Sequence, residues 1–201
     1  MTLTVAIASE FDPYDGEIYR YLLETVLRVT VVKWTGTFMF SGYRTVAKFA
    51  PAFLTAAAGH NIQHAILAVD NDGGARRRPE HAENHEPTVF ALDDDDVCRE
   101  CWLTQALPIT WGASGGRSCV VVPVQVIETW LLAIRGDELI PTAEQKYNRS
   151  AIKKEFFGRQ IPPLAQRIAL AMHELQKPNA LTILGERPSF NRFVNRLRSW
   201  E

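Results

Sequence analysis

Short apolar runs alternate along this chain with longer segments in which apolar residues recur at helical spacing. A short, continuous apolar run is typical of a strand that is buried on both faces, whereas spacings of three and four indicate an amphipathic helix. The pattern predicts strands over Thr4–Ser9, Val29–Trp34, Ala65–Val69 and Ser118–Val124, and helices over Gly16–Arg28, Tyr43–Ala58, Asp96–Leu107 and Val126–Ile134. Buried strands separated by helices predict an α/β fold, with a mostly parallel sheet covered on both sides.

The size and composition of the chain set the outer limits for its function. Its 201 residues fit one domain with a helical extension, and 46% hydrophobic residues are ordinary for a globular protein. The formal net charge of −1 gives no overall attraction to nucleic acid, which would need local basic patches or a basic partner. No apolar stretch approaches the roughly 20 residues of a membrane span, and the N-terminus has no signal-peptide pattern. We therefore expect a cytoplasmic protein that does not enter the membrane.

Two carboxylates follow the predicted strand over residues 65–69. Asp70 and Asp72 are two residues apart and precede the glycine pair Gly73–Gly74. On an extended chain such residues project to the same side, so both acids can face a hard cation such as Mg²⁺. The same residue types are also common in a solvated turn, which is the alternative interpretation.

Two further acids lie near the ends of other predicted strands. Glu10 directly follows the first strand, and Glu128 lies in an almost wholly apolar segment. Because the carboxyl ends of parallel strands meet at one edge of a sheet, we expect Glu10, Asp70, Asp72 and Glu128 to cluster there. The structural alternatives are a surface loop acid for Glu10 and a helix-start acid for Glu128.

These acids and two sequence motifs resemble the Toprim domain of topoisomerases, primases and nucleases. The segments Val122–Ala133 (VPVQVIETWLLA) and Arg187–Phe193 (RPSFNRF) resemble, more narrowly, the small Toprim-like proteins of bacterial antiphage defence loci, which are related to OLD-family nucleases. The resemblance implies a Toprim-like, Rossmann-like sandwich over residues 1–140, with a C-terminal helical extension over residues 141–201 packed on it.

The resemblance also implies a function. It makes the chain a nuclease that hydrolyses phosphodiester bonds of DNA or RNA with Mg²⁺ or Mn²⁺, as the effector of a defence system coupled to an ATPase partner. The implied metal ligands and catalytic residues are Glu10, Asp70, Asp72 and Glu128. An alternative is a catalytically silent scaffold of the same fold that binds a protein or nucleic acid.

The first acid departs from the pattern of the family. Relatives commonly have Glu-Gly at this point, whereas Phe11 follows Glu10 here and the first glycine is Gly16, directly before Glu17. An insertion in this loop would make Glu17 the candidate, so the sequence leaves both acids open as the first catalytic carboxylate. A carboxylate in the first turn also stabilises a helix, which is the structural interpretation of Glu17.

Basic residues near the acids indicate where phosphates would bind. Arg76, Arg77 and Arg78 follow the acidic pair closely enough to hold phosphates beside a metal, although a solvated basic loop has the same composition. The C-terminal region mixes further lysines and arginines with aromatic residues, including Phe156, Phe190, Phe193 and Trp200. Such a mixture suits stacking on single-stranded nucleic acid, while aromatic residues at helical spacing also serve as core.

Overall fold

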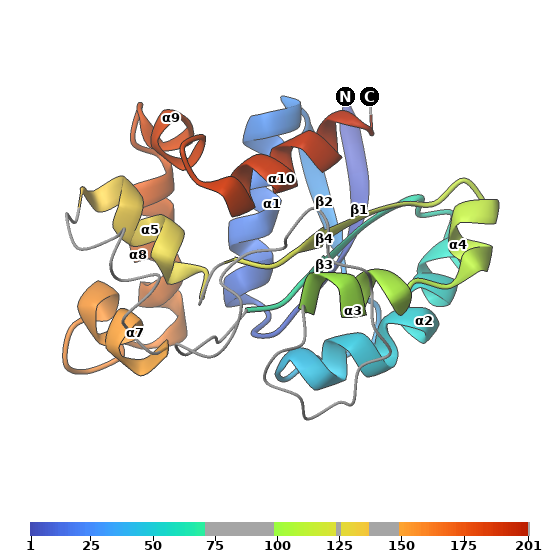
Figure 1. The fold of residues 1–201 in the computed structure, drawn as a ribbon, viewed down its shortest axis with the longest axis horizontal. Coiled ribbons are helices and arrows are strands. Elements are labelled where there is room, and N and C mark those ends of the chain that lie inside the picture. The colour runs from blue at the N-terminus through green and yellow to red at the C-terminus, as the bar shows by residue number, and fades with distance from the viewer. Residues whose placement is uncertain (71–98, 124–125, 137–148, 201) are drawn as a thin grey trace. The chain divides into compact units, whose positions relative to one another are not determined.

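The protein has an α/β fold built on a four-stranded, all-parallel sheet (Figure 1). The structure is a computed structural model that describes residues 1–70, 99–123, 126–136 and 149–200. The strands are β1 (Thr2–Ser9), β2 (Thr30–Trp34), β3 (His64–Ala68) and β4 (Arg117–Val121). The helices within the described residues are α1 (Tyr14–Leu27), α2 (Tyr43–Gly59), α3 (Arg99–Gln105), α4 (Ile109–Ala113), α5 (Glu128–Arg135), α7 (Arg149–Phe157), α8 (Leu164–Leu175), α9 (Ala180–Leu184) and α10 (Pro188–Arg198).

The chain folds into two compact units. The sheet unit consists of Met1–Val69, Glu100–Val121 and Phe193–Glu201, and it contains all four strands. The helical unit consists of Asp70–Arg99 and Val122–Arg192.

The sheet has the strand order β2-β1-β3-β4, with β1 and β3 in the middle. Side chains of β1 and β3 are buried on both faces, and this explains why these strands appear in the sequence as continuous apolar runs. In the pairing of the two central strands, Ser9 at the end of β1 is opposite Ala68 at the end of β3. The carboxyl ends of the strands therefore lie at one edge, as the sequence pattern predicts.

Helices cover both faces of the sheet unit. The chain leaves β1 toward β2 and then returns past β1 to β3, so right-handed crossovers place α1 and α2 on opposite faces. The end of α10 joins α1, where the rings of Tyr19 and Phe193 meet edge to face with centroids 6.2 Å apart. Figure 1 shows α1 and this part of α10 on one side of the strands, with α2, α3 and α4 on the other.

The helical unit is organised around α5, whose residues from Glu128 to Ile134 are all buried and which packs against α7, α8 and α9. Trp130 is the largest fully buried side chain of the chain's described part. Its indole N–H donates to Ser189 Oγ at 3.1 Å, and its ring meets Phe190 edge to face at 5.2 Å. The RPSFNRF motif therefore supplies core contacts to α5.

Most element boundaries fall within a few residues of the sequence pattern. Between the last strand and the following helix, β4 ends at Val121 rather than Val124, and α5 begins at Glu128 rather than Val126. The pattern extends both elements too far toward each other because it cannot distinguish an apolar turn from an apolar strand or helix. A division of the chain at residue 140 stays a prediction. Among the described residues, no helix is long and apolar enough to cross a membrane.

Candidate metal centre

Asp70 is placed by the end of β3 and lies against the start of α5. It comes two positions after Ala68, the last residue of the strand, and its side chain is only 6% exposed. Its Oδ1 accepts a hydrogen bond of 3.1 Å from the backbone N–H of Ile127, the residue directly before α5. The first N–H groups of a helix have no partner within it, so an aspartate here satisfies one of them and interacts favourably with the helix dipole.

Glu128 is the first residue of α5 and is 1% exposed. A fully buried carboxylate is costly unless it is paired, hydrogen-bonded or coordinated to a metal. The ammonium of Lys153, on α7, lies 4.0 Å from Glu128 Oε1. The fold thus brings two buried acids, Asp70 and Glu128, to the first turn of one helix, with a lysine beside the second.

A second basic side chain contacts the backbone of this region. The guanidinium of Arg99, at the start of α3, donates to the carbonyl oxygen of Asp70. Arg99 is buried as well. Because the arginine binds the main chain, it helps to fix the backbone position of Asp70.

The donor set of this site suits a hard cation that keeps much of its own hydration. Within the described ranges, no group of three or more histidine, cysteine, aspartate or glutamate side chains is placed to hold a metal. Mg²⁺ is commonly bound through one or two carboxylates, with water and substrate phosphate completing its octahedral shell. Asp70 and Glu128 fit that pattern, and they do not fit the closed four-ligand shell of a structural zinc site.

Glu10 belongs to the sheet unit and directly follows β1. It is 4% exposed, and its carbonyl oxygen accepts a hydrogen bond of 3.3 Å from the N–H of Gly42. Next to it, Phe11 N–H donates to Asp15 Oδ2 at 3.0 Å, and the N–H of Asp15 returns a bond to the Phe11 carbonyl. The surface-loop alternative for Glu10 is therefore wrong, because this acid is buried in a loop that is fixed at both ends.

The hydroxyl of Ser9 adds a polar group at the same end of β1. Ser9 is fully buried, and its Oγ has no hydrogen-bond partner among the residues that the structure describes. A buried hydroxyl without a partner is costly. The carboxyl end of β1 therefore keeps unused hydrogen-bonding capacity beside Glu10.

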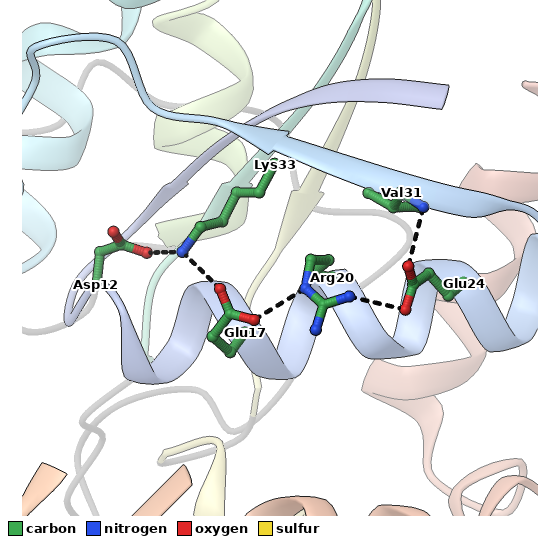
Figure 2. Close-up of polar contacts among 6 residues, drawn as sticks. All are labelled: Asp12, Glu17, Arg20, Glu24, Val31 and Lys33. Atoms are coloured by element: carbon green, nitrogen blue, oxygen red, sulfur yellow. Dashed lines mark hydrogen bonds and ion pairs between the residues drawn. The ribbon is translucent and has the colours of Figure 1, made fainter. Parts of the chain in front are cut away.

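Glu17, the alternative first acid, is engaged in a network of ion pairs (Figure 2). One carboxylate oxygen lies 2.8 Å from Arg20 Nε and the other lies 3.0 Å from Lys33 Nζ, while Lys33 also contacts Asp12 at 2.9 Å. Arg20 continues the network to Glu24 at 2.9 Å. Partial burial acts to raise the pKa of Glu17, but the hydrogen bonds and charges of Arg20 and Lys33 outweigh it and lower that pKa.

This network gives Glu17 a structural role. Its carboxylate links α1 to β2 through Lys33, as Figure 2 shows. At Gly16 an added Cβ would lie 2.1 Å from Asp12 Oδ1, so the glycine before Glu17 makes room for the ion pair of Lys33 with Asp12. The role of Glu10 as the first catalytic carboxylate stays a prediction.

Other predicted site residues lie outside the described residues. These are Asp72 and the basic loop Arg76–Arg78. Their assignment as metal ligand and as phosphate-binding residues stays a prediction, as does the complete set of four acids.

Four aromatic residues of the C-terminal region belong to the protein core. Phe156, Phe190, Phe193 and Trp200 are all buried. Their interpretation as a platform for nucleic acid bases is therefore wrong, since a buried ring has no face for a base to stack on. Apolar spacing alone cannot make this distinction, because a core helix and an aromatic binding surface share the same residue types.

The sequence gives little indication that two basic side chains, Arg99 and Lys153, lie near Asp70 and Glu128. Arg99 lies 29 positions from Asp70 along the chain, and it is preceded by no motif that links the two. Lys153 appears in the sequence only as one of many basic residues near the C-terminus. Both contacts depend on tertiary packing, which single-sequence patterns do not reveal.

Comparisons of the chain with protein-family models, with curated proteins and with solved structures give no match.

Proposed function

We propose that the protein is a metal-dependent nuclease that hydrolyses phosphodiester bonds with Mg²⁺ or Mn²⁺. The observation that carries this proposal is the burial of two acids at the start of α5: Asp70 Oδ1 accepts the N–H of Ile127, and Glu128 is the first residue of the helix. A buried carboxylate loses its hydration and needs hydrogen bonds, a basic side chain or a metal ion in exchange. Two such acids at the start of one helix would offer a divalent cation two oxygen ligands.

The residues present account for binding and orientation at such a site. Asp70 is held by the backbone of Ile127, and Arg99 fixes the carbonyl of Asp70, so one carboxylate is positioned from both sides. A divalent cation held by Asp70 and Glu128 would neutralise charge on a scissile phosphate and supply an activated water. Lys153, beside Glu128, would place a further positive charge near the phosphate.

The acids indicate only the class of the substrate, a phosphodiester. A site of buried carboxylates and lysine suits phosphodiester chemistry, but it does not choose between DNA and RNA, or between cleavage at ends and within the strand. Glu10 and Asp72 complete the proposed set of ligands by resemblance. The same resemblance supports an ATPase partner in antiphage defence.

The direct experiment is cleavage of labelled single- and double-stranded DNA and RNA in the presence of Mg²⁺ or Mn²⁺, with and without an ATPase partner. Glu128→Gln and Asp70→Asn should each abolish cleavage, since they remove the charge while keeping the shape of the side chain. Glu17→Gln is the matched control, because its carboxylate is engaged in ion pairs and should leave cleavage unchanged. Cleavage that survives both site variants would refute the proposal.

A catalytically silent scaffold is the second candidate function, and the same contacts favour it. In that case Asp70 acts only as a helix-capping group for α5, and Lys153 neutralises Glu128. The wild-type protein would then show no metal-dependent cleavage with any of these substrates. Divalent cations would also leave its stability unchanged.

A further inference from the structure

The first half of α2 carries two cations, each of which lies beside an aromatic ring. Arg44 and Lys48 are exposed and are the only charged residues of the 17-residue helix Tyr43–Gly59. Phe49 beside Lys48 remains 39% exposed, and Tyr43 is partly exposed. We call these four residues the α2 face. Both of its charged residues are cations, in a chain whose overall charge is −1.

Each cation of the α2 face is held against an aromatic ring. The guanidinium carbon of Arg44 lies 5.8 Å from the ring centroid of Tyr43, and Arg44 Nε donates to the Tyr43 hydroxyl at 3.1 Å. The ammonium of Lys48 lies 5.6 Å from the centroid of the Phe49 ring. These contacts order side chains that would otherwise sample many rotamers, which lowers the entropy lost when a ligand binds.

The α2 face lies at the edge of the sheet unit where the strands have their carboxyl ends. The helix begins after the carboxyl end of β2, and the residue before it, Gly42, donates its N–H to the Glu10 carbonyl at 3.3 Å. The adjacent residue Ser41 forms a β-bridge with Phe11, which follows Glu10. Two short backbone links thus tie the start of α2 to the loop that carries a candidate catalytic acid.

We propose that the α2 face binds single-stranded nucleic acid, with Arg44 and Lys48 contacting phosphates and Phe49 stacking on a base. Single-strand binding proteins combine positive charge that follows the backbone with exposed aromatic rings on which bases stack. A duplex hides its base faces and would leave the exposed ring of Phe49 unused. This proposal rests on the nuclease function, because it takes the α2 face as the surface that binds the substrate strand.

The test is direct binding of a short, fluorescein-labelled, single-stranded oligothymidylate, measured by fluorescence anisotropy in EDTA so that no cleavage occurs. The double variant Arg44→Gln, Lys48→Gln should weaken binding about 25-fold at 0.1 M salt and reduce the slope of log K against log salt by about 1.4, since each phosphate contact contributes about 0.7. Phe49→Leu, which keeps an apolar side chain but removes the ring, should weaken binding about tenfold with an unchanged salt slope.

A matched control removes two positive charges from the opposite edge of the sheet unit. Arg28 follows the end of α1, and Arg198 ends α10; both are exposed. The double variant Arg28→Gln, Arg198→Gln should bind the oligonucleotide within about twofold of the wild type, since distant exposed charges are screened beyond roughly 10 Å at 0.1 M salt. Circular dichroism melting of all variants checks that each is folded.

Three results would overturn the proposal. The first is that the wild-type protein does not bind the oligonucleotide. An acidic surface of a partner protein would then be the better candidate to bind the α2 face. The second is equal weakening by the α2 and control variants. The third is tighter binding of a duplex of the same sequence. Because binding is measured without divalent cations, a failure of the nuclease proposal in the Asp70 and Glu128 variants remains distinguishable from a failure of this surface.

Discussion

Replacing Asp70 separates its structural contact from its proposed role as a metal ligand. Asp70→Ala removes the acceptor of the buried Ile127 N–H, whereas Asp70→Asn keeps a carbonyl oxygen at the position of Oδ1 and removes only the charge. A buried donor that loses its acceptor costs about 1–3 kcal/mol. For a chain of this size, each kcal/mol corresponds to roughly 2–4 °C in melting temperature. We therefore expect Asp70→Ala to melt several degrees below the wild type and Asp70→Asn to melt close to it.

Magnesium then distinguishes the two proposed functions. A ligand that binds only the folded state stabilises it by RT ln(1 + [L]/Kd), about 1.4 kcal/mol at ten times the Kd. The wild type should gain this stability in a Mg²⁺ titration followed by circular dichroism melting, and both Asp70 variants should lose the gain. Glu155→Gln, which removes an exposed acid of the same unit, is the control and should keep it.

Two results would refute this reasoning. Asp70→Ala melting at the wild-type temperature would show that the hydrogen bond to Ile127 contributes nothing to the start of α5. A magnesium-dependent gain that persists in Asp70→Asn would show that the cation binds elsewhere on the protein.

Further predictions concern the packing of the sheet unit. Folding lowers the pKa of Glu17, so the stabilisation from its ion pairs is present above the ordinary pKa of 4.5 and is lost as the pH falls through the folded-state pKa. Glu17→Gln should remove this part of the pH dependence of stability, as measured by urea unfolding at pH 3 to 6. Burial raises the pKa of Cys119 to about 12, so iodoacetamide at pH 8 should leave this thiol unmodified in the native protein, as mass spectrometry would show. Arg196→Met should destabilise the protein by about 2 kcal/mol, because it removes a cation that binds the buried Glu100 and a donor to the Val120 carbonyl. The double change with Glu100→Met should restore part of that loss; equal stability of the single and double variants would contradict this account.

The sequence by itself determined the fold class and most of the elements of the sheet unit. The runs that form β1 and β3 are recognisable because both faces of each strand are buried, so nearly every position must be apolar. The helix α2 is recognisable because its buried side chains recur at helical spacing. These are local patterns, and each follows from the environment of one segment.

Tertiary structure alone decided what the polar residues contact. Glu10 and Glu17 are both plausible catalytic acids in the sequence, and only the structure shows that Glu17 forms ion pairs with residues of α1 and β2. Asp70 lies 57 positions before Ile127, and only the fold brings its carboxylate to the start of α5. The physical reason is that apolar burial repeats along a segment with the period of the helix or strand, whereas a hydrogen bond or ion pair joins two residues whose separation in the sequence obeys no period.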